Sequence, residues 1–392
     1  MLQSANNMST SNTQKINIMF VVPCLGFGGL ERVVLDLVRG LDRSRFEPSL
    51  CSLLEPHTGM IEATRDLNIA VHVLPKGNGV NYFLPFRLSS LFMRKRVHLV
   101  NAHDIGATLY AAAAARLAGV RHVVHTDHSQ ILTKRGFLPV YRWVFRHGIS
   151  HATVVSEHLR RYLLDTFSLP EARVTTIPNG IDVERFAVPL DTSSLHRELG
   201  IREGALVIGS IGRLMEQKGM EYLLQAFARL SRRGSDMKLV IVGEGELRQD
   251  LECLARHLQV SDRVVFTGIR NDIPHLMRLF DVFVLPSLWE GQPITIVEAM
   301  AAGRAIVATD VGGNAEILHH GEFGVLVSPR DENALADAID ALLSDAARAG
   351  GLGKRAASHA ERELTSASMV RRYEELFAAI AMGRSAAYPP SP

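Results

Sequence analysis

The feature that most constrains the fold is a rhythm in which short runs rich in Val and Ile alternate with segments of helical pattern. Strands joined by helical crossovers pair in parallel, because each crossover returns the chain to its earlier direction. The runs expected as strands are 16–23, 48–54, 71–75, 97–103, 121–128 and 151–156, followed after a gap by 206–213, 238–243, 264–268, 282–287 and 305–309. At 392 residues the chain is too long for one ordinary core. The sequence therefore predicts an α/β protein with two Rossmann-like parallel sheets in series.

The expected domain limits follow from this rhythm. We expect a first Rossmann-like domain over residues 15–185, a second over 205–365 and a final helix over 366–383. The segment 186–204 has little strand pattern and is interpreted as a linker. The polar head 1–14 and the Pro-rich tail 384–392 have compositions typical of disorder.

The charge is divided unevenly between the two halves. Residues 1–190 hold 21 Lys and Arg against 14 Asp and Glu, a net charge of +7, whereas the whole chain carries +2. This excess favours an anionic partner such as a phosphorylated acceptor or a bilayer surface. Nucleic acid is not expected, because the basic residues are scattered and aromatic residues make up only 6%. With three scattered cysteines and no apolar run of about 18 residues, we expect a cytoplasmic protein, peripheral at most to the inner face of a membrane.

The segment 285–303, LPSLWEGQPITIVEAMAAG, carries the strongest functional signal. A buried strand would deliver Glu290 to a sheet edge, and Glu298 would lie about one turn inside the next helix. Carboxylates accept hydrogen bonds from hydroxyls, while free amides at a helix N-terminus attract anions. The pattern indicates a polyhydroxylated, negatively charged ligand, although an ordinary strand, loop and helix with solvated acids has the same pattern.

Two cations precede this segment in GRLMEQKGMEYLL, residues 212–224. Arg213 is expected at a strand end and Lys218 near the start of the following helix. Together they could clamp a diphosphate, Arg213 through paired hydrogen bonds and Lys218 as a point charge. Such a clamp stabilises a leaving diphosphate without a metal, and no Asp-x-Asp pair occurs in the chain. Two solvated surface cations remain the alternative.

A glycine-rich turn, GFGGLE at residues 26–31, joins the first expected strand to a helix. Gly28 and Gly29 could let backbone amides approach a phosphate, although a structural tight turn is also possible. The dinucleotide fingerprint requires glycine where Glu31 stands, so binding of NAD is disfavoured.

Histidines cluster near the fifth expected strand. A zinc site is suggested by His122, His125 and His128. Side chains alternate between the two faces of a strand, however, so His125 would point away from the other two. His128 is better placed to face a cleft and to hydrogen-bond a sugar hydroxyl or a phosphate. His103 and Asp104 could line the same cleft on the acceptor side, or the histidines could be buried structural residues.

Basic and large apolar side chains combine on expected helices of the positive half. Residues 94–96 are Arg-Lys-Arg, and residues 134–148 read KRGFLPVYRWVFRHG. This mixture is typical of contact with an anionic membrane. A solvated helix face over a buried aromatic stripe would give a similar pattern.

Four segments together resemble a known family. They are GRLMEQKG (212–219), IVGEGELR (241–248), FTGIRNDI (266–273) and LPSLWEGQPITIVEAMAAGRAIVATDVGGNAEIL (285–318). With this spacing the chain, from residue 16 to about 381, resembles retaining glycosyltransferases of the GT-B fold, in the family 4 group that builds bacterial surface polysaccharides and glycolipids. The resemblance implies two facing domains and a C-terminal helix that crosses back onto the first domain.

The resemblance also implies roles for particular residues. Arg213 and Lys218 would bind the donor diphosphate, Glu298 the ribose hydroxyls and Glu290 the donor sugar. The cleft histidine would be His128, and the four catalytic side chains would be Arg213, Lys218, Glu290 and His128. The other donor contacts would come from Gly28, Gly29, Gly243, Gly268, Ile269, Arg270, Gly291, Ile294 and Thr295.

The chain departs from the family pattern just after the Glu290-Gly291 pair. Many members have Phe-Gly where this chain has Gln292-Pro293, and proline removes a backbone donor. We therefore expect a glycosyltransferase that uses a nucleotide sugar of the UDP or GDP type, with a saccharide or lipid-linked acceptor and no essential metal cofactor. A nucleotide-sugar-binding regulatory module without transfer, or an NAD-dependent oxidoreductase, is the alternative.

Overall fold

A computed structural model describes residues 15–383 except 27, 57–63, 66, 78, 130–136, 188–190 and 234–235. The head 1–14 and the tail 384–392, expected to be disordered, lie outside the described residues, as do Lys134 and Arg135 of the basic run.

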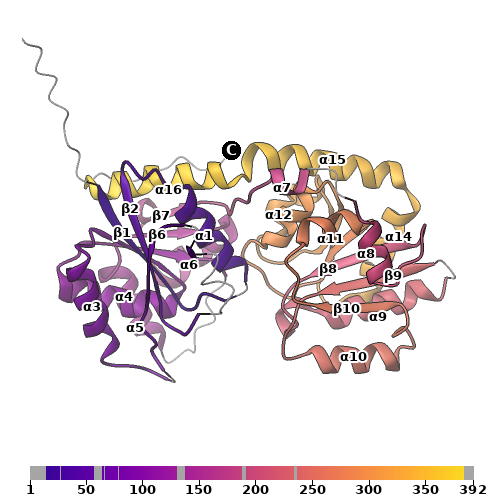
Figure 1. Cartoon of the computed structure of the whole chain (residues 1–392), viewed down its shortest axis with the longest axis horizontal. Coiled ribbons are helices and arrows are strands. Elements are labelled where there is room, and N and C mark those ends of the chain that lie inside the picture. The colour runs from indigo at the N-terminus through magenta and orange to yellow at the C-terminus, as the bar shows by residue number, and fades with distance from the viewer. Residues whose placement is uncertain are drawn as a thin grey trace, which may run out of the picture.

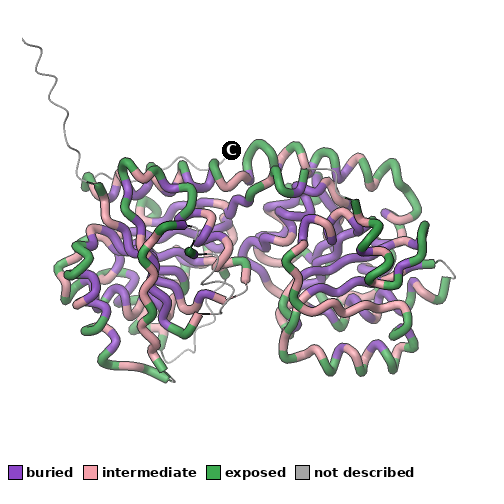
Figure 2. The backbone as a smooth tube through the Cα atoms, in the orientation of Figure 1, coloured by how far each residue is buried: buried purple, intermediate pink, exposed green. Residues whose placement is uncertain are grey.

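The first domain is built on a parallel sheet with the order β3-β2-β1-β4-β5-β6-β7. Its strands are β1 (Ile16–Val22), β2 (Phe46–Ser52), β3 (Ala70–Val73), β4 (Leu99–His103), β5 (His122–Asp127), β6 (His151–Val154) and β7 (Val174–Thr176). Its helices are α1 (Gly29–Gly40), α3 (Leu84–Arg94), α4 (Ile105–Ala118), α5 (Leu138–His147) and α6 (Glu157–Phe167), with a short 3-10 helix η2 (Glu171–Arg173). Burial of the central strands on both faces explains their continuous apolar runs (Figure 2).

The second domain repeats the plan with the strand order β10-β9-β8-β11-β12-β13. Its strands are β8 (Leu206–Ile211), β9 (Met237–Val242), β10 (Val264–Gly268), β11 (Val282–Leu285), β12 (Ala305–Thr309) and β13 (Val325–Val327). Its helices are η3 (Glu216–Lys218), α9 (Met220–Ser231), α10 (Arg248–His257), α11 (Ile273–Leu279), α12 (Ile294–Ala301), α13 (Asn314–Ile317), η4 (His319–Gly321), α14 (Glu332–Ser344) and α15 (Ala346–Glu363). The two Rossmann-like parallel sheets are thus confirmed.

The segment expected as a linker contains secondary structure of its own. Helix α7 (Glu184–Ala187) ends inside its first residues, and α8 (Ser193–Glu198) lies within it. Both short helices pack against α11 of the second domain. The sequence pattern did not reveal these helices, because a helix of about one turn has too few positions to show an apolar period and its segment also contains turn-forming residues.

The C-terminal helix α16 (Ser366–Ala381) crosses back onto the first domain, as the resemblance implied (Figure 1). It packs against α1, and the ring of Phe377 meets Phe20 of β1 edge to face, with centroids 6.1 Å apart. The buried Tyr373 hydroxyl hydrogen-bonds the hydroxyls of Thr126 and Thr153 on neighbouring strands. The last helix is therefore an integral part of the first domain's core.

The chain passes between the domains twice, at residues 180–181 and 364–366, and these two passages are paired. The Ile181 amide donates to the Leu364 carbonyl at 3.0 Å, and the Ser366 amide donates to the Ile181 carbonyl at 2.7 Å. One buried apolar cluster contains Phe20 of the first sheet and Phe283 of the second. Among the described helices, none combines the length and apolar character needed to cross a bilayer.

Candidate functional site

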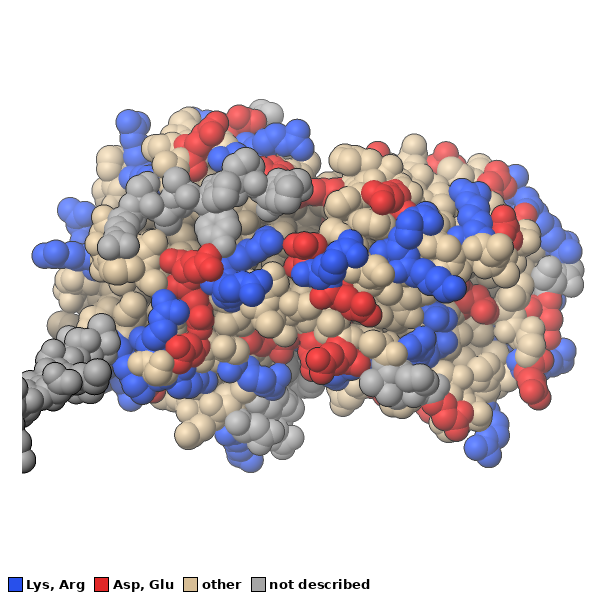
Figure 3. Space-filling view, turned by 90° about the horizontal axis from the view of Figure 1, so that it is seen from above, with Lys and Arg blue, Asp and Glu red and all other residues tan. Residues whose placement is uncertain are grey.

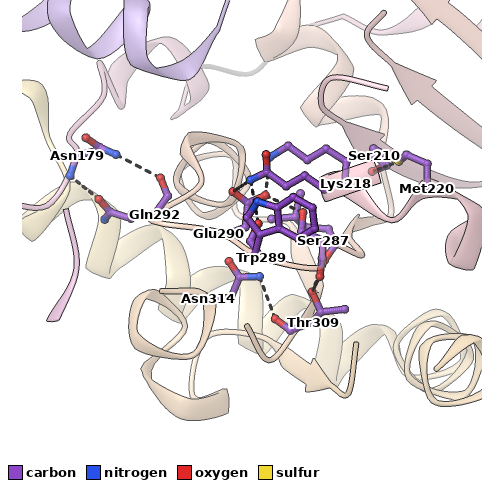
Figure 4. A network of polar contacts seen from close by, with 12 residues as sticks. Asn179, Ser210, Lys218, Met220, Ser287, Trp289, Glu290, Gln292, Thr309 and Asn314 are labelled. Carbon is purple, nitrogen blue, oxygen red and sulfur yellow. Dashed lines mark hydrogen bonds and ion pairs between the residues drawn. The ribbon is translucent and has the colours of Figure 1, made fainter. Parts of the chain in front are cut away.

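The turn between β11 and α12 lies at the carboxyl edge of the second sheet and holds Glu290 in a polar network (Figure 4). Glu290 is 7% exposed and accepts hydrogen bonds from the Ser287 hydroxyl at 2.7 Å and from the Lys218 ammonium at 2.5 Å. Gln217 holds the same loop by donating to the Trp289 carbonyl at 2.9 Å. The turn is thus fixed by side chains from η3 as well as by its own.

The two cations expected to act together are placed differently. Lys218, at the end of η3, is ion-paired with Glu290 and mostly buried. Arg213, just after β8, is exposed. It faces Glu31 of α1, whose pKa is raised by burial and lowered in part by this arginine. The structure therefore supplies one open cation and one cation that is already neutralised by a carboxylate.

The N-terminus of α12 is a second polar feature of this region. Pro293 is in extended conformation just before the helix, so the first helical residue is Ile294 rather than the proline. The Thr295 hydroxyl is buried without a hydrogen-bond partner among the described residues. An orphaned hydroxyl beside helix N-terminal amides is an arrangement suited to a phosphate oxygen.

Glu298 lies one turn further along α12 and is 3% exposed. Burial raises the pKa of its carboxyl, while Arg32 opposes the shift. The Arg32 guanidinium of α1 donates to Glu298 Oε1 at 2.7 Å, so the pair joins the two domains. Sequence reasoning missed Arg32, because its partner lies 266 residues away.

The domains also meet through closely packed backbone. A Cβ on Gly29 would lie 3.2 Å from Ile294, and one on Gly291 would lie only 2.1 Å from the His128 carbonyl oxygen. Glycine is required at Gly291 because any side chain would force the first domain's loop away.

Polar side chains complete this junction. The Gln292 side-chain oxygen accepts a hydrogen bond from the Asn179 backbone amide. The Gln292 backbone carbonyl accepts a second one from the Asn179 side chain at 3.2 Å. The Glu316 carboxylate accepts a hydrogen bond from the first-turn amide of Glu157 at 2.8 Å and so caps α6 from the other domain. Gln292, the departure from the family pattern, thus serves the domain junction.

The segment 268–270, expected to line a base pocket, presents one apolar side chain to solvent. Ile269 is 53% exposed. Arg270 is held by Asp272 at 2.7 Å and by Glu198 at the end of α8. Gly268 accepts a hydrogen bond from the Gly243 amide at 2.9 Å. Gly243 has φ of 134° and lies against the Gly212 carbonyl, which gives this glycine a structural reason independent of any ligand.

The structure brings His103 and His128 together at the carboxyl edge of the first sheet. Their rings stack, and His103 Nδ1 and His128 Nε2 are 2.8 Å apart, so one ring donates to the other. Burial lowers the pKa of His128 to about 4 and that of His103 well below its usual value. Both are therefore neutral at pH 7 and can offer hydrogen bonds but no charge. Asp104 uses its carboxylate to cap α4.

The zinc alternative finds no geometric support in the part of the chain that the structure describes, where no three His, Cys, Asp or Glu side chains converge. His125 is turned inward, with its Nδ1 2.7 Å from the Thr108 hydroxyl. That transfer needs no metal stays a prediction.

Comparison with known proteins matches both halves of the chain. The model for Glycosyltransferase Family 4 matches residues 27–185, and that for Glycosyl transferases group 1 matches residues 191–359. A GDP-mannose-dependent alpha-(1-6)-phosphatidylinositol monomannoside mannosyltransferase of Mycobacterium tuberculosis is 33% identical over 276 residues, 65% of this chain and 71% of that enzyme. The chain belongs to the glycosyl transferases group 1 family. It is a glycosyltransferase of the bacterial polysaccharide and glycolipid type.

Two further glycosyltransferases extend the comparison. The UDP-Gal:alpha-D-GlcNAc-diphosphoundecaprenol alpha-1,3-galactosyltransferase of Escherichia coli is 29% identical over 352 residues, 86% of this chain and 90% of that enzyme. The crystal structure of HepE from Anabaena in complex with UDP-glucose superposes with a TM-score of 0.83 at 23% identity, covering 93% of this chain and all of the other. The latter confirms the GT-B fold.

Proposed function

We propose that this glycosyltransferase moves a sugar from a nucleoside diphosphate sugar of the UDP or GDP type to a hydroxyl of a saccharide or lipid-linked acceptor, with retention at the anomeric carbon. The observation that carries the proposal is the placement of Arg213, the Lys218–Glu290 pair and the Thr295 hydroxyl, which has no partner among the described residues, after the carboxyl ends of the neighbouring parallel strands β8 and β11. The relatives named for UDP-galactose and GDP-mannose act on donors of this class.

In the proposed reaction the bond between the anomeric carbon and the diphosphate oxygen breaks. The acceptor oxygen attacks from the same face, and its proton passes to the departing diphosphate. Negative charge then grows on the diphosphate, where Arg213, Lys218 and the N-terminus of α12 can stabilise it. Lys218 can serve this purpose only by sharing its charge between Glu290 and the diphosphate.

The remaining groups would bind and orient the substrates. Glu298 would accept hydrogen bonds from the ribose hydroxyls, and the exposed Ile269 would contact the base. The neutral His128 would hydrogen-bond the sugar or acceptor, with its ring fixed by His103.

Donor binding tests the proposal directly. Titration calorimetry with UDP, GDP and their sugar conjugates should give binding of one nucleoside diphosphate, and Arg213→Ala should weaken it. Turnover of isotope-labelled donor in the presence of membrane extract should then yield a labelled glycolipid or saccharide. Unchanged turnover in an Arg213→Ala, Lys218→Ala double variant would rule out the assigned role of these cations.

The acceptor is proposed to be reached at a membrane surface, through the outer faces of α3 and α5. Large apolar side chains stand exposed there: Tyr82, Phe83, Phe86 and Met93 on or beside α3, and Phe137, Val140 and Trp143 on or beside α5. Exposed basic side chains accompany them: Arg87, Arg94, Lys95, Arg96, Arg142 and Arg146. Helix α4 packs between α3 and α5, so all three lie on one side of the sheet (Figure 1). Such a surface fits the interface of an anionic bilayer.

Charges of both signs are mixed on another face of the molecule. Viewed onto α15 and α16, Lys and Arg alternate with Asp and Glu over both domains (Figure 3). The excess positive charge of the first half is therefore not gathered on that face.

Sedimentation with vesicles tests the membrane contact. Vesicles of phosphatidylcholine with phosphatidylglycerol should retain the protein, and a Phe86→Ser, Trp143→Ser double variant should be released. Leu54→Ser, an exposed apolar residue of the same domain outside these helices, should bind like the wild type. Equal retention of all three proteins would count against this surface.

A further inference from the structure

The Arg32–Glu298 ion pair joins the two domains at a position where a ligand is proposed to bind. Arg32 lies in the first turn of α1, and Glu298 lies in α12 of the other domain. The side chain of Arg32 is 37% exposed, whereas that of Glu298 is 3% exposed. The hydrogen bond of 2.7 Å uses Oε1 of the carboxylate. An ionised carboxylate has about four acceptor sites, so the arginine leaves capacity for ligand hydroxyls.

The surroundings of Glu298 make the arginine necessary. Burial raises the pKa of this carboxyl, and a protonated carboxyl would lose acceptor capacity. The charged groups that face it are Arg32 and Asp36 on α1 and Arg185 on α7. Asp36 raises the pKa of Glu298, as burial does, whereas Arg32 and Arg185 lower it. Arg32 is the group that hydrogen-bonds the Glu298 carboxylate directly.

We propose that Arg32 is a positioning residue, which holds Glu298 ionised and oriented so that the carboxylate can accept hydrogen bonds from the ribose hydroxyls of the donor nucleotide. This inference rests on the proposed function, because it assumes that Glu298 binds the ribose. It assigns the first domain a part in recognising a nucleotide that the second domain binds.

The position of Arg32 couples nucleotide recognition to contact between the domains. Helix α1 begins at Gly29, which packs against Ile294 at the start of α12. The neighbouring residue Glu31 faces Arg213 from the same helical turn. Separation of α1 from α12 would remove the guanidinium and leave a buried carboxylate unpaired, so the ribose site is complete only when the domains are in contact.

The opposite role is physically distinct. If Arg32 occupied the ribose position as a plug, its removal would free Glu298, and the nucleotide would bind more tightly. If Arg32 positions Glu298, its removal weakens binding, and the loss is confined to interactions with the ribose hydroxyls. The two roles therefore differ in the sign of the effect.

Calorimetry with UDP or GDP, whichever the wild type binds more tightly, and with its 2′-deoxy counterpart tests the inference. The wild type should prefer the ribonucleotide by roughly 10- to 100-fold, the range for hydrogen bonds to a charged group. Arg32→Gln should lose most of this preference, and Arg32→Lys should keep part of it, because lysine retains the charge but not the guanidinium geometry. The Arg32→Gln, Glu298→Gln double variant should be no worse than Glu298→Gln alone.

The pH dependence gives a readout that a merely structural role would not move. Without Arg32, protonation of Glu298 is favoured, so ribonucleotide affinity in Arg32→Gln should fall as the pH is lowered below neutrality. The wild type should change less over the same range. Arg45→Gln is the matched control, since Arg45 is a first-domain arginine paired with Glu374 at 3.7 Å, away from Glu298. Thermal unfolding of each variant verifies that it is folded.

Each result decides one question. Unchanged ribose preference in Glu298→Gln would overturn the proposed nucleotide site itself. Lost preference in Glu298→Gln with full preference and a wild-type pH profile in Arg32→Gln and Arg32→Lys would overturn only the role of Arg32. Tighter binding in Arg32→Gln would show that the arginine is a plug.

Discussion

Replacing Lys218 by methionine separates the effect of its buried ion pair on stability from its effect on catalysis. The ammonium lies 2.5 Å from Glu290 Oε1, and the side chains are only 17% and 6% exposed. Methionine keeps most of the volume but leaves the Glu290 carboxylate buried without a cation. Removing one partner of a buried pair costs about 3–5 kcal/mol. Glu290 still accepts hydrogen bonds from Ser287 at 2.7 Å and from Gln217 at 3.5 Å, so the expected loss is near the lower end, about 3 kcal/mol.

The catalytic effect should be separable from this loss of stability. Removing a group that stabilises the developing charge costs about 2.7–4 kcal/mol, or roughly 10²- to 10³-fold in kcat. In a Lys218→Met, Glu290→Gln double variant no charge remains buried, so most of the stability should return. The activity should stay low, because the cation for the diphosphate is still missing.

The two tryptophans of the chain make the assay selective. Trp143 lies on α5 of the first domain, and Trp289 adjoins Glu290 in the second. In a Trp143→Phe background, urea titration followed by Trp289 fluorescence reports unfolding around the site. Lys238→Met is the control, since this lysine of the same domain donates to the Asp262 carbonyl in an exposed position. A single Lys218→Met variant within about 1 kcal/mol of the wild type, or a double variant with restored turnover, would refute the reasoning.

Three further predictions follow from particular contacts. Gly291→Ala places a methyl group 2.1 Å from the His128 carbonyl oxygen, so turnover should fall at least roughly 10-fold while far-ultraviolet circular dichroism keeps the wild-type spectrum; full activity would contradict the close approach. Tyr373→Phe removes the hydroxyl that hydrogen-bonds Thr126 and Thr153. In urea titration the free energy of unfolding of the first domain should fall by about 1–2 kcal/mol. An unchanged free energy of unfolding would contradict these hydrogen bonds. The pKa of His128 is about 4 in the folded state, below the unfolded value of about 6.5. The unfolded state therefore binds more protons, and stability falls as the pH is lowered from 6.5 towards 4. The His128→Asn variant should show a flatter dependence of the thermal unfolding temperature on pH over this range.

The sequence predicted the sheets well because their strands are buried on both faces and read as continuous apolar runs. It missed β7, residues Val174–Thr176, and β13, residues Val325–Val327. Each has three residues and lies at the edge of its sheet, so neither has enough positions to show a period.

The sequence predicted the local structure around Glu290 but not the contacts that join this region to distant segments. The strand, turn and helix around Glu290 follow from neighbouring residues, and the structure places them as expected. The partners of Lys218 and Glu298 could not be predicted, because an ion pair between distant segments leaves no local pattern. Gln292 was noted only as a departure from the family, although it forms the hydrogen bonds to Asn179 that join the domains.

The crossing of α16 onto the first domain has a consequence for how the chain matures during translation. Phe377 and Tyr373 fill the interior of a domain whose sheet is synthesised first. On the ribosome, β1 to β7 emerge long before this helix and must wait with part of their apolar surface uncovered until residues 366–381 leave the exit tunnel. Shortening the gene from its 3′ end should therefore yield aggregated nascent chains in which the N-terminal domain, although fully translated, has not matured.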